Sequence, residues 1–316
     1  MIKKFYNYFL SNLILIIYVS SFKIYRIFIN KNSIKTFEII IFSFDRPLQV
    51  KSLLDSILKY IDYEIKVNVF YKCSNASFNQ SYNSIIKDYQ KYHSRFKFIK
   101  QKNNFKNDFI YFINNLDIRF DKHFLFFVDD QIIFRNINLK KLNCLLGNSF
   151  LATFRLGLNT KWSFNLNKPQ SLNNYKKEIF KDFVTWRPKL VKEDISYPLS
   201  LDATSIPSVL IKFYANFLYY HGPNTFESSM NYGLLIFYFL KLKISAPINQ
   251  AAVNIVISLV NNECINRGTF INTKTLQQYF IDGWYLELNE KNIDSIVSPH
   301  IENFVYLTKA DQIKKL

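Results

Sequence analysis

Between residues 37 and 128, short apolar runs alternate regularly with segments whose apolar residues recur at helical spacing. Buried strands are predicted at 37–43, 64–71, 95–100 and 123–128, and helices between them at 47–60, 81–93 and 107–116. Pro47 suits the first turn of a helix, because its missing N–H is not needed there. Strands and helices that alternate at this spacing favour an α/β fold, with a doubly wound, mostly parallel sheet and helices on both faces.

The alternation weakens after residue 135, so the second half of the chain is predicted to be more irregular. A strand is predicted within 149–157, a long loop at 159–195, and helices at 209–220, 227–240 and 275–286. No repeat or low-complexity linker marks a domain boundary. We therefore expect an N-terminal segment (1–35), one large domain (36–290) with halves at 36–135 and 136–290, and a C-terminal tail (291–316).

The 316 residues carry a formal net charge of +17, and 49% of them are hydrophobic. Such a surface favours anionic partners, namely phosphates, an acidic membrane or nucleic acid. The lysines are scattered, and the absence of an RNA-recognition motif, zinc finger or basic zipper argues against nucleic acid. Neither a P-loop nor GxGxxG occurs. Cys73, Cys144 and Cys264 form no CxxC pair, so a reducing compartment fits better than a disulfide framework.

Residues 5–22 carry no charge, and this length is at the lower edge for a membrane-spanning helix. Two asparagines and three serines within the run weaken that interpretation. More basic residues follow the run than precede it: Lys23, Arg26, Lys31 and Lys35 against Lys3 and Lys4. The positive-inside tendency therefore places the main domain in the cytoplasm, associated with the inner face of the membrane. The alternative is an N-terminal helix that packs on the domain.

Two adjacent acids interrupt an apolar stretch in FLFFVDDQIIFR (124–135). An unpaired buried charge is costly, so Asp129 and Asp130 either lie in a solvated turn or meet a cation. The carboxyl ends of parallel strands meet at one edge of a sheet, where ligands bind in such folds. We therefore expect the loops after the first, second and fourth strands to share that edge: 43–46, 72–75 and 129–131.

Four stretches carry a family resemblance: FSFDRPLQVKSLLDSI, VDDQIIF, SYPLSLDATS with HGPNTFE, and LQQYFIDGW. They resemble motifs of nucleotide-sugar glycosyltransferases with the GT-A fold, of a family-two-like, bacterial surface-polysaccharide type. The resemblance spans about residues 37–290, and VDDQIIF resembles the hydrophobic strand and DxD motif of that family. Two positions depart from its pattern. Asp45 stands where Asn is common, and Gln131 stands where a second metal-binding acid is usual.

The resemblance implies metal-assisted, inverting transfer of a sugar from a nucleotide-diphosphate donor to a hydroxyl of a glycan or lipid-linked acceptor. Mn²⁺ or Mg²⁺ would be held by Asp129, Asp130 and Gln131. The residues implied in donor binding lie mainly in the strand-end loops: Ser43, Asp45, Arg46, Lys72, Ser74, Asn75, Asn104, Asp108, Asp129 and Arg155. Alternatively, Arg46 forms an ordinary ion pair and Asn104 caps a helix.

A carboxylate on the acceptor side is expected to take the proton from the acceptor hydroxyl. Glu227, after Pro223-Asn224-Thr225, and Asp202, in LSLDATS, are the candidates for this base. Glu227 could instead be a helix-start residue and Asp202 a turn residue, and a retaining enzyme would need no such base. Two other functions stay open: a catalytically weak or inactive scaffold with this fold, which Gln131 supports, and a basic nucleic-acid-binding protein.

Overall fold

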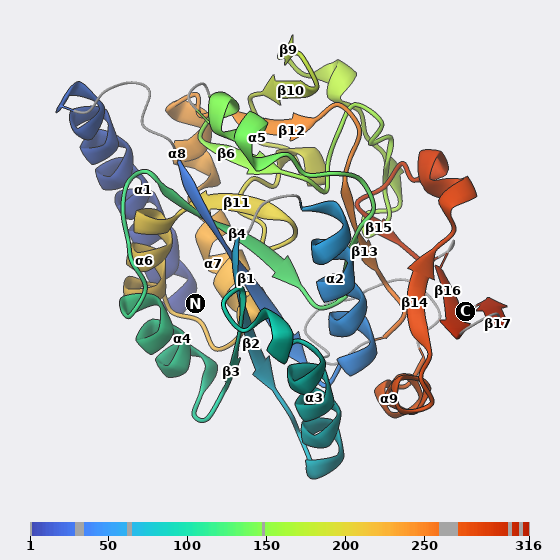
Figure 1. Cartoon of the computed structure of the whole chain (residues 1–316). Helices are drawn as coiled ribbons and strands as arrows, with labels where there is room; N and C mark the ends of the chain where they lie inside the picture. The colour runs from blue at the N-terminus through green and yellow to red at the C-terminus, as the bar shows by residue number, and fades with distance from the viewer. Residues whose placement is uncertain are drawn as a thin grey trace.

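The computed structural model describes residues 2–28, 35–61, 65–146, 149–258, 271–302, 305–309 and 312–315 (Figure 1). Lys31 and Cys264 lie outside the described residues. A nine-stranded sheet forms the centre of the molecule, in the order β3-β2-β1-β4-β11-β6-β12-β10-β9. Its first four strands are parallel and correspond to the predicted ones: β3 (Phe96–Lys100), β2 (Lys66–Lys72), β1 (Thr36–Phe44) and β4 (Lys122–Val128). The predicted α/β fold, with a mostly parallel sheet in this half, is confirmed.

The sheet continues with strands from the second half of the chain. β11 (Thr204–Pro207) pairs antiparallel with both β4 and β6 (Leu151–Thr153), and β12 (Ile244–Pro247) runs parallel to β6. β10 (Phe183–Trp186) and β9 (Lys177–Phe180) complete it as antiparallel neighbours. The predicted loop at 159–195 thus contributes two strands to the sheet, and it also holds β7 (Trp162–Ser163), β8 (Lys168–Pro169) and the short helices η2 (Leu172–Asn174) and η3 (Asp194–Ser196).

Alternate residues of the central strands enter two separate hydrophobic cores, as the two-residue period of a strand requires. Ile39 and Ile41 of β1 pack with α2 (Pro47–Tyr60) and α3 (Ala76–Asp88). Ile40 and Phe42 pack on the opposite face with α4 (Phe105–Asn114) and α6 (Ser208–Phe217). Both faces are therefore buried, which explains why these strands are continuous apolar runs.

Polar capping residues decide where the helices of the first half begin. The Asn75 side chain accepts a hydrogen bond from Phe78 N at 3.1 Å, so α3 starts five residues before the predicted position. The next residues, ASFNQ, show no clear apolar period, which is why the spacing alone placed the start too late. Asn104 caps α4 in the same way, accepting from Asn107 N at 2.9 Å, so its predicted alternative role as an N-cap is observed.

The predicted helix at 227–240 is divided into α7 (Pro223–Asn231) and α8 (Leu234–Phe239). The break lies at Gly233, where an added Cβ would meet Ser11 Oγ at 2.9 Å. Ser11 belongs to α1 (Ile2–Phe28), which packs against α6, α7 and α8 (Figure 1). Within the part of the chain that the structure describes, α1 is the one helix long and apolar enough to cross a membrane, and those criteria alone are weak evidence.

The remaining elements join the end of the chain to its middle. β5 (Gln131–Ile133), β13 (Ala252–Ile255) and β15 (His300–Ile301) form one small sheet, and β14 (Tyr285–Leu288), β16 (Val305–Lys309) and β17 (Gln312–Lys315) form another. The predicted tail at 291–316 is therefore paired with earlier strands rather than separate. The other helices are α5 (Leu139–Leu145), α9 (Thr273–Ile281), η1 (Gln90–Tyr92) and η4 (Glu290–Ser295).

Candidate active site

The loops after β1, β2 and β4 lie together at one edge of the sheet, as predicted. Asp45 follows β1 and accepts a hydrogen bond from Ser74 N at 2.8 Å, and its own N–H donates to Lys72 O at 3.3 Å. Asp45 has a φ of 53°, in the left-handed region that Asn and Asp tolerate better than other side chains. The replacement of the family's common Asn by Asp at this turn therefore has a backbone explanation.

Asp129 is the fixed centre of this edge. Its Oδ2 accepts from Ser43 Oγ and from Phe44 N, both at 2.9 Å, and its Oδ1 accepts from Arg46 Nη1 at 2.9 Å. Ser43 in turn hydrogen bonds to the hydroxyl of Tyr82 from α3. The Asp129 side chain is almost fully buried, so these three hydrogen-bond donors offset the cost of burying its negative charge.

Arg46 is the cation that meets the two adjacent acids. Its Nη1 lies 2.9 Å from Asp129 Oδ1 and 3.1 Å from Asp130 Oδ2, and its Nη2 donates to Ser258 O at 2.6 Å. One guanidinium cannot balance two carboxylates. Burial raises the pKa of Asp130, Arg46 opposes this shift, and the charges of Asp129 and Asp202 add to it, so that the resulting pKa is about 7. Asp130 keeps 20% of its side-chain surface exposed, whereas Asp129 keeps 6%.

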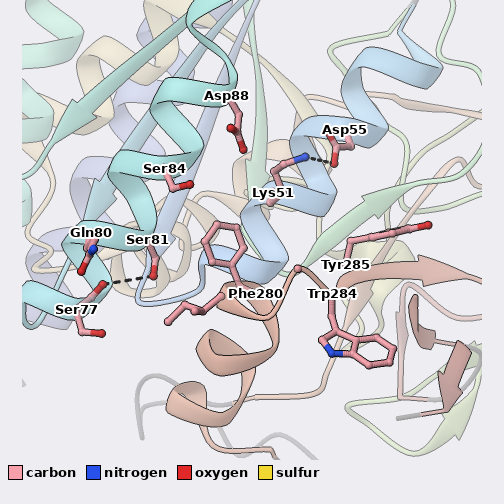
Figure 2. A pocket seen from close by; sticks show the side chains of 12 residues that line it. Lys51, Asp55, Ser77, Gln80, Ser81, Ser84, Asp88, Phe280, Trp284 and Tyr285 are labelled. Atoms are coloured by element: carbon pink, nitrogen blue, oxygen red, sulfur yellow. Dashed lines mark hydrogen bonds and ion pairs between the residues drawn. The ribbon is translucent and has the colours of Figure 1, made fainter. Parts of the chain in front are cut away.

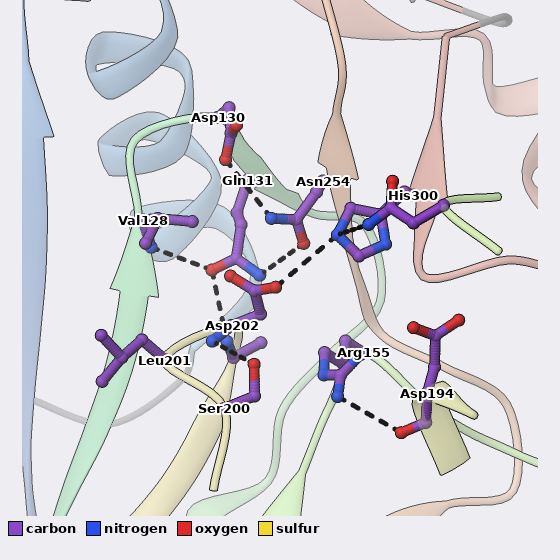
Figure 3. A network of polar contacts seen from close by, with 12 residues as sticks. Val128, Asp130, Gln131, Arg155, Asp194, Ser200, Leu201, Asp202, Asn254 and His300 are labelled. Atoms are coloured by element: carbon purple, nitrogen blue, oxygen red, sulfur yellow. Dashed lines mark hydrogen bonds and ion pairs between the residues drawn. The ribbon is translucent and has the colours of Figure 1, made fainter. Parts of the chain in front are cut away.

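Gln131 connects this edge of the sheet, where the loops after β1, β2 and β4 meet, to the second half of the chain (Figure 3). Its Oε1 accepts from Val128 N at 3.0 Å and from Ala203 N at 3.2 Å, and its Nε2 donates to Asn254 Oδ1 at 3.0 Å. Because both acceptor positions of this buried amide oxygen are engaged, the geometry does not support the expected role of Gln131 as a metal ligand. Asn254 extends the network, since its Nδ2 donates to Asp130 Oδ1 at 3.3 Å.

Glu227 and Asp202 lie close to each other in the second half of the chain, but they are held differently. Glu227 Oε2 accepts from Leu201 N at 2.5 Å and from Ser200 Oγ at 3.3 Å, so this carboxylate fixes the loop that carries Asp202. Burial and the charge of Asp202 together raise the pKa of Glu227 to about 7, against the lowering effect of the Leu201 N–H and Arg155. The Asp202 carboxylate lies 3.7 Å from His300 Nε2 and is 16% exposed (Figure 3).

His300 and Asn254 belong to this site although the sequence did not indicate them. Burial lowers the pKa of His300, which favours the neutral imidazole, while Asp202 opposes the shift. Isolated histidines and asparagines have no spacing motif, so only the pairing of β13 with β5 and β15 brings them to the site. Arg155, predicted at the diphosphate, is buried among acceptor-side loops, where its Nη2 donates to Tyr197 O at 3.1 Å and Asp194 O at 3.4 Å.

The other residues predicted to bind the nucleotide sugar lie on the strand-end loops, where their side chains are exposed or hydrogen bond to neighbouring residues. Lys72, Ser74 and Asn75 are exposed after β2, and Lys72 Nζ lies 5.6 Å from the centroid of the Phe44 ring. Asp108 accepts from Lys102 N and Asn103 N, both at 2.7 Å, so it fixes the loop before α4 together with the cap residue Asn104. After β2, the Asn75 side chain caps α3 and its Nδ2 donates to Ser74 Oγ at 3.3 Å, whereas the Lys72 side chain is exposed beside them.

A separate pocket of about 630 Å³ lies between α2, α3 and the α9–β14 turn (Figure 2). Its lining includes none of the residues predicted for the site: Lys51, Asp55, Ser77, Gln80, Ser81, Ser84, Asp88, Phe280, Ile281, Gly283, Trp284 and Tyr285. Among the described residues, no group of three or more His, Cys, Asp or Glu side chains is arranged to hold a metal ion.

Comparison with known proteins finds no matching family model. The bifunctional glycosyltransferase pgtA of Dictyostelium discoideum is 27% identical over an alignment of 225 residues that covers 61% of this chain and 28% of that protein. The chain therefore spans less than a third of the length of this relative.

Several solved structures are similar at low TM-scores. TarS 1-349 of S. aureus in complex with UDP-GlcNAc has a TM-score of 0.45 and 18% identity, covering 69% of this chain and 57% of that one. GalNAc-T7 with UDP, GalNAc and Mn²⁺ has a TM-score of 0.46 and 10% identity, covering 79% and 48%. A 4-diphosphocytidyl-2C-methyl-D-erythritol synthase from Anaerococcus prevotii has a TM-score of 0.41 and 12% identity, covering 79% and 98%.

The sheet order and the curated relative agree with the motifs in the sequence. This chain is an α/β protein with a GT-A-like fold, and its resemblance to glycosyltransferases is confirmed.

Proposed function

We propose that this protein is a glycosyltransferase that moves a sugar from a nucleotide-diphosphate donor to an acceptor hydroxyl. The observation that carries the proposal is the pair at the end of β4. Asp129 is locked by three donors, and the partly exposed Asp130 beside it is joined through Asn254 and Gln131 to the loop of Asp202. A donor held at this edge would thus lie between a fixed anionic pair and an acceptor-side carboxylate.

The donor would bind across the loops after β1 and β2. Open α/β sheets bind ligands in the crevice beyond the carboxyl ends of their strands, and these loops form that edge here. Asp45 ties the two loops together through Ser74 N, and the exposed Lys72 adds positive charge beside them. We propose that Ser43, Asp45, Lys72, Ser74 and Asn75 form the nucleoside side of the site.

A divalent cation fits this site at Asp130 rather than at all three predicted ligands. Asp129 is enclosed and Gln131 is engaged, but Asp130 is partly exposed and its Oδ1 has one long contact, at 3.3 Å. The site also holds more carboxylates than arginines, with Asp129, Asp130, Asp202 and Glu227 beside Arg46 and Arg155. Mn²⁺ or Mg²⁺ at Asp130 would complete its shell with water and donor phosphate oxygens and would neutralise the leaving diphosphate.

We propose Asp202 as the base and Glu227 as the residue that positions it. The Glu227 carboxylate is committed to Leu201 N and Ser200 Oγ. The Asp202 carboxylate faces His300 and keeps some exposed surface, so an acceptor hydroxyl could reach it. Removal of that proton as the sugar is transferred fits inverting chemistry.

The proposal is tested by a screen of purified protein against UDP-, GDP-, dTDP- and CMP-sugars with Mn²⁺ or Mg²⁺, scored by release of nucleotide. Turnover of at least one donor is expected, and Asp130→Ala should remove it. If no donor is turned over while the protein binds polynucleotide with a steep salt dependence, the basic nucleic-acid-binding alternative is preferred.

The cytoplasmic face of a membrane is the proposed place of action. Its support is the uncharged run at 5–22 with lysines on both sides and a net charge of +17. The acceptor is then a glycan or a lipid-linked molecule at that surface.

A further inference from the structure

Helix α1 has two apolar faces, and only one of them is covered by the rest of the protein. The covered face carries Ile14, Leu15, Tyr18 and Val19, which belong to the larger hydrophobic core. The opposite face is exposed along nearly the whole helix, with large apolar side chains at the spacing of a helical stripe: Ile2, Phe5, Phe9, Leu13, Ile16, Ile17 and Ile24. A helix of this kind is neither a core helix nor a solvated surface helix.

The polar residues that weaken a membrane-spanning interpretation are fixed to the protein. Asn7 Nδ2 donates to Tyr219 O at 2.7 Å and to Ser229 Oγ at 2.8 Å, and Ser11 Oγ donates to Met230 O at 2.8 Å. Asn12 Nδ2 donates to Tyr232 O at 3.1 Å. These contacts hold α1 against the C-terminal end of α7 and the segments on either side of that helix, so α1 cannot cross a bilayer without drawing these parts of the domain with it.

The apolar surface extends beyond α1. Helix α6 packs against α1, and its side chains Phe213 and Phe217 are also exposed. The charges at the borders are positive, with Lys3 and Lys4 at one end of the uncharged run and Lys23 at the other. Apolar side chains between lysines are the pattern of a helix that lies in the headgroup layer of an anionic membrane.

We propose that α1 lies flat in the interface of an anionic membrane, with its exposed stripe in the acyl boundary and its lysines at the headgroups. Helix α7 links this surface to the candidate active site. Ser229 of α7 binds Asn7, whereas Glu227, two residues earlier, binds the loop of Asp202. The acceptor loop is therefore one helix away from the membrane surface, which selects a lipid-linked acceptor over a soluble glycan. This last step rests on the proposed function.

The test uses the full chain and vesicles of phosphatidylcholine alone or mixed with phosphatidylglycerol. Phe5 and Phe9 are 73% and 59% exposed, so the double variant Phe5→Glu/Phe9→Glu should fold normally. Ile179 and Phe180 on β9 are 57% and 59% exposed, and Ile179→Glu/Phe180→Glu is the matched control. We expect wild type and control to sediment with anionic vesicles, and the α1 variant to bind at least about tenfold more weakly.

Four results would overturn the proposal. Equal sedimentation of all three proteins, or no sedimentation of the wild type, would show that the exposed stripe of α1 does not bind the membrane. If the wild type is a dimer and Phe5→Glu/Phe9→Glu is a monomer, the stripe instead binds a second copy of the chain. Resistance of the wild type to alkaline carbonate extraction would show a spanning helix instead.

The acceptor step has its own measurement, which separates it from the proposed function. Nucleotide release with vesicles of a total bacterial lipid extract should fall in the α1 variant and not in the control, while release without vesicles stays equal. Equal release with vesicles would overturn the lipid-linked acceptor. If no protein releases nucleotide at all, the proposed function fails, and vesicle sedimentation still decides the membrane surface.

Discussion

The two carboxylate pairs at the candidate active site differ in the groups that stabilise their negative charges. Asp129 and Asp130 share a buried guanidinium, which lies 2.9 Å from one carboxylate and 3.1 Å from the other. Glu227 instead accepts hydrogen bonds from Leu201 N and Ser200 Oγ, and Asp202 faces His300 at 3.7 Å. An ion pair fixes position, whereas neutral donors and a weakly basic imidazole leave a carboxyl group free to exchange a proton. This difference supports the proposal that the first pair helps to hold the donor and that Asp202 of the second pair accepts the proton.

Removal of the arginine should break the first pair most severely. Arg46→Ala leaves Asp129 buried without its cation, and breaking a buried pair in this way costs about 3–5 kcal/mol of the free energy of unfolding. Urea denaturation measures the loss. Arg135→Ala is the matched control, because the partner of Arg135, Asp294, is 99% exposed and such pairs contribute about 1 kcal/mol or less. Equal losses in the two variants would contradict a special role for Arg46.

Asp130→Ala should affect turnover strongly and the free energy of unfolding only slightly. The residue is partly exposed and its pKa is raised, so the free energy of unfolding should change little. Turnover should fall by about 10³-fold, as for the loss of a major electrostatic contact to the transition state. The measurement is nucleotide release under saturating donor, with Asp294→Ala as control. Wild-type turnover in Asp130→Ala, or a full rate in EDTA, would remove the cation from the proposal.

The second pair can be resolved by amide substitutions of similar shape. Asp202→Asn should lower kcat by about 10²-fold, because the general base is lost. Glu227→Gln should lower it by less than about tenfold, since an amide oxygen can still accept from Leu201 N. Steady-state kinetics on both variants checks the order. A larger loss in Glu227→Gln than in Asp202→Asn would exchange the two roles.

The smallest expected effect is on the pH dependence of stability. The pKa of Glu227 is raised from 4.5 to about 7, so between these values the folded state binds more protons than the unfolded state. Stability from this group is therefore full below pH 4.5 and is lost as the pH rises through 7. Glu227→Gln removes that loss, so its free energy of unfolding should fall less than that of wild type between about pH 5 and 8. If the free energy of unfolding, measured with urea, changes by the same amount between these pH values in both proteins, the raised pKa of Glu227 is wrong.

The first half of the chain and its edge were predictable because local patterns suffice there. Continuous apolar runs such as 37–43 and 123–128 are long enough to mark buried strands, and Pro47 marks a helix start. Because these strands run parallel, their carboxyl ends lie at one edge of the sheet. The proximity of Asp45, Arg46 and Asp130 follows from these rules without any knowledge of contacts.

The tertiary structure decided what those residues bind. Contacts between residues more than 70 positions apart decide these partners. They pair Arg46 with both acids, join Gln131 to Ala203, and bring His300 and Asn254 into the site. The second half has short strands of four residues or fewer, where tertiary pairing outweighs local preference. The same holds for α1. Its sequence determined a helix with an uncharged apolar run at 5–22, but only packing on α7 decided which face is buried and which remains exposed. Helical periodicity defines the faces of a helix and does not define what packs on them.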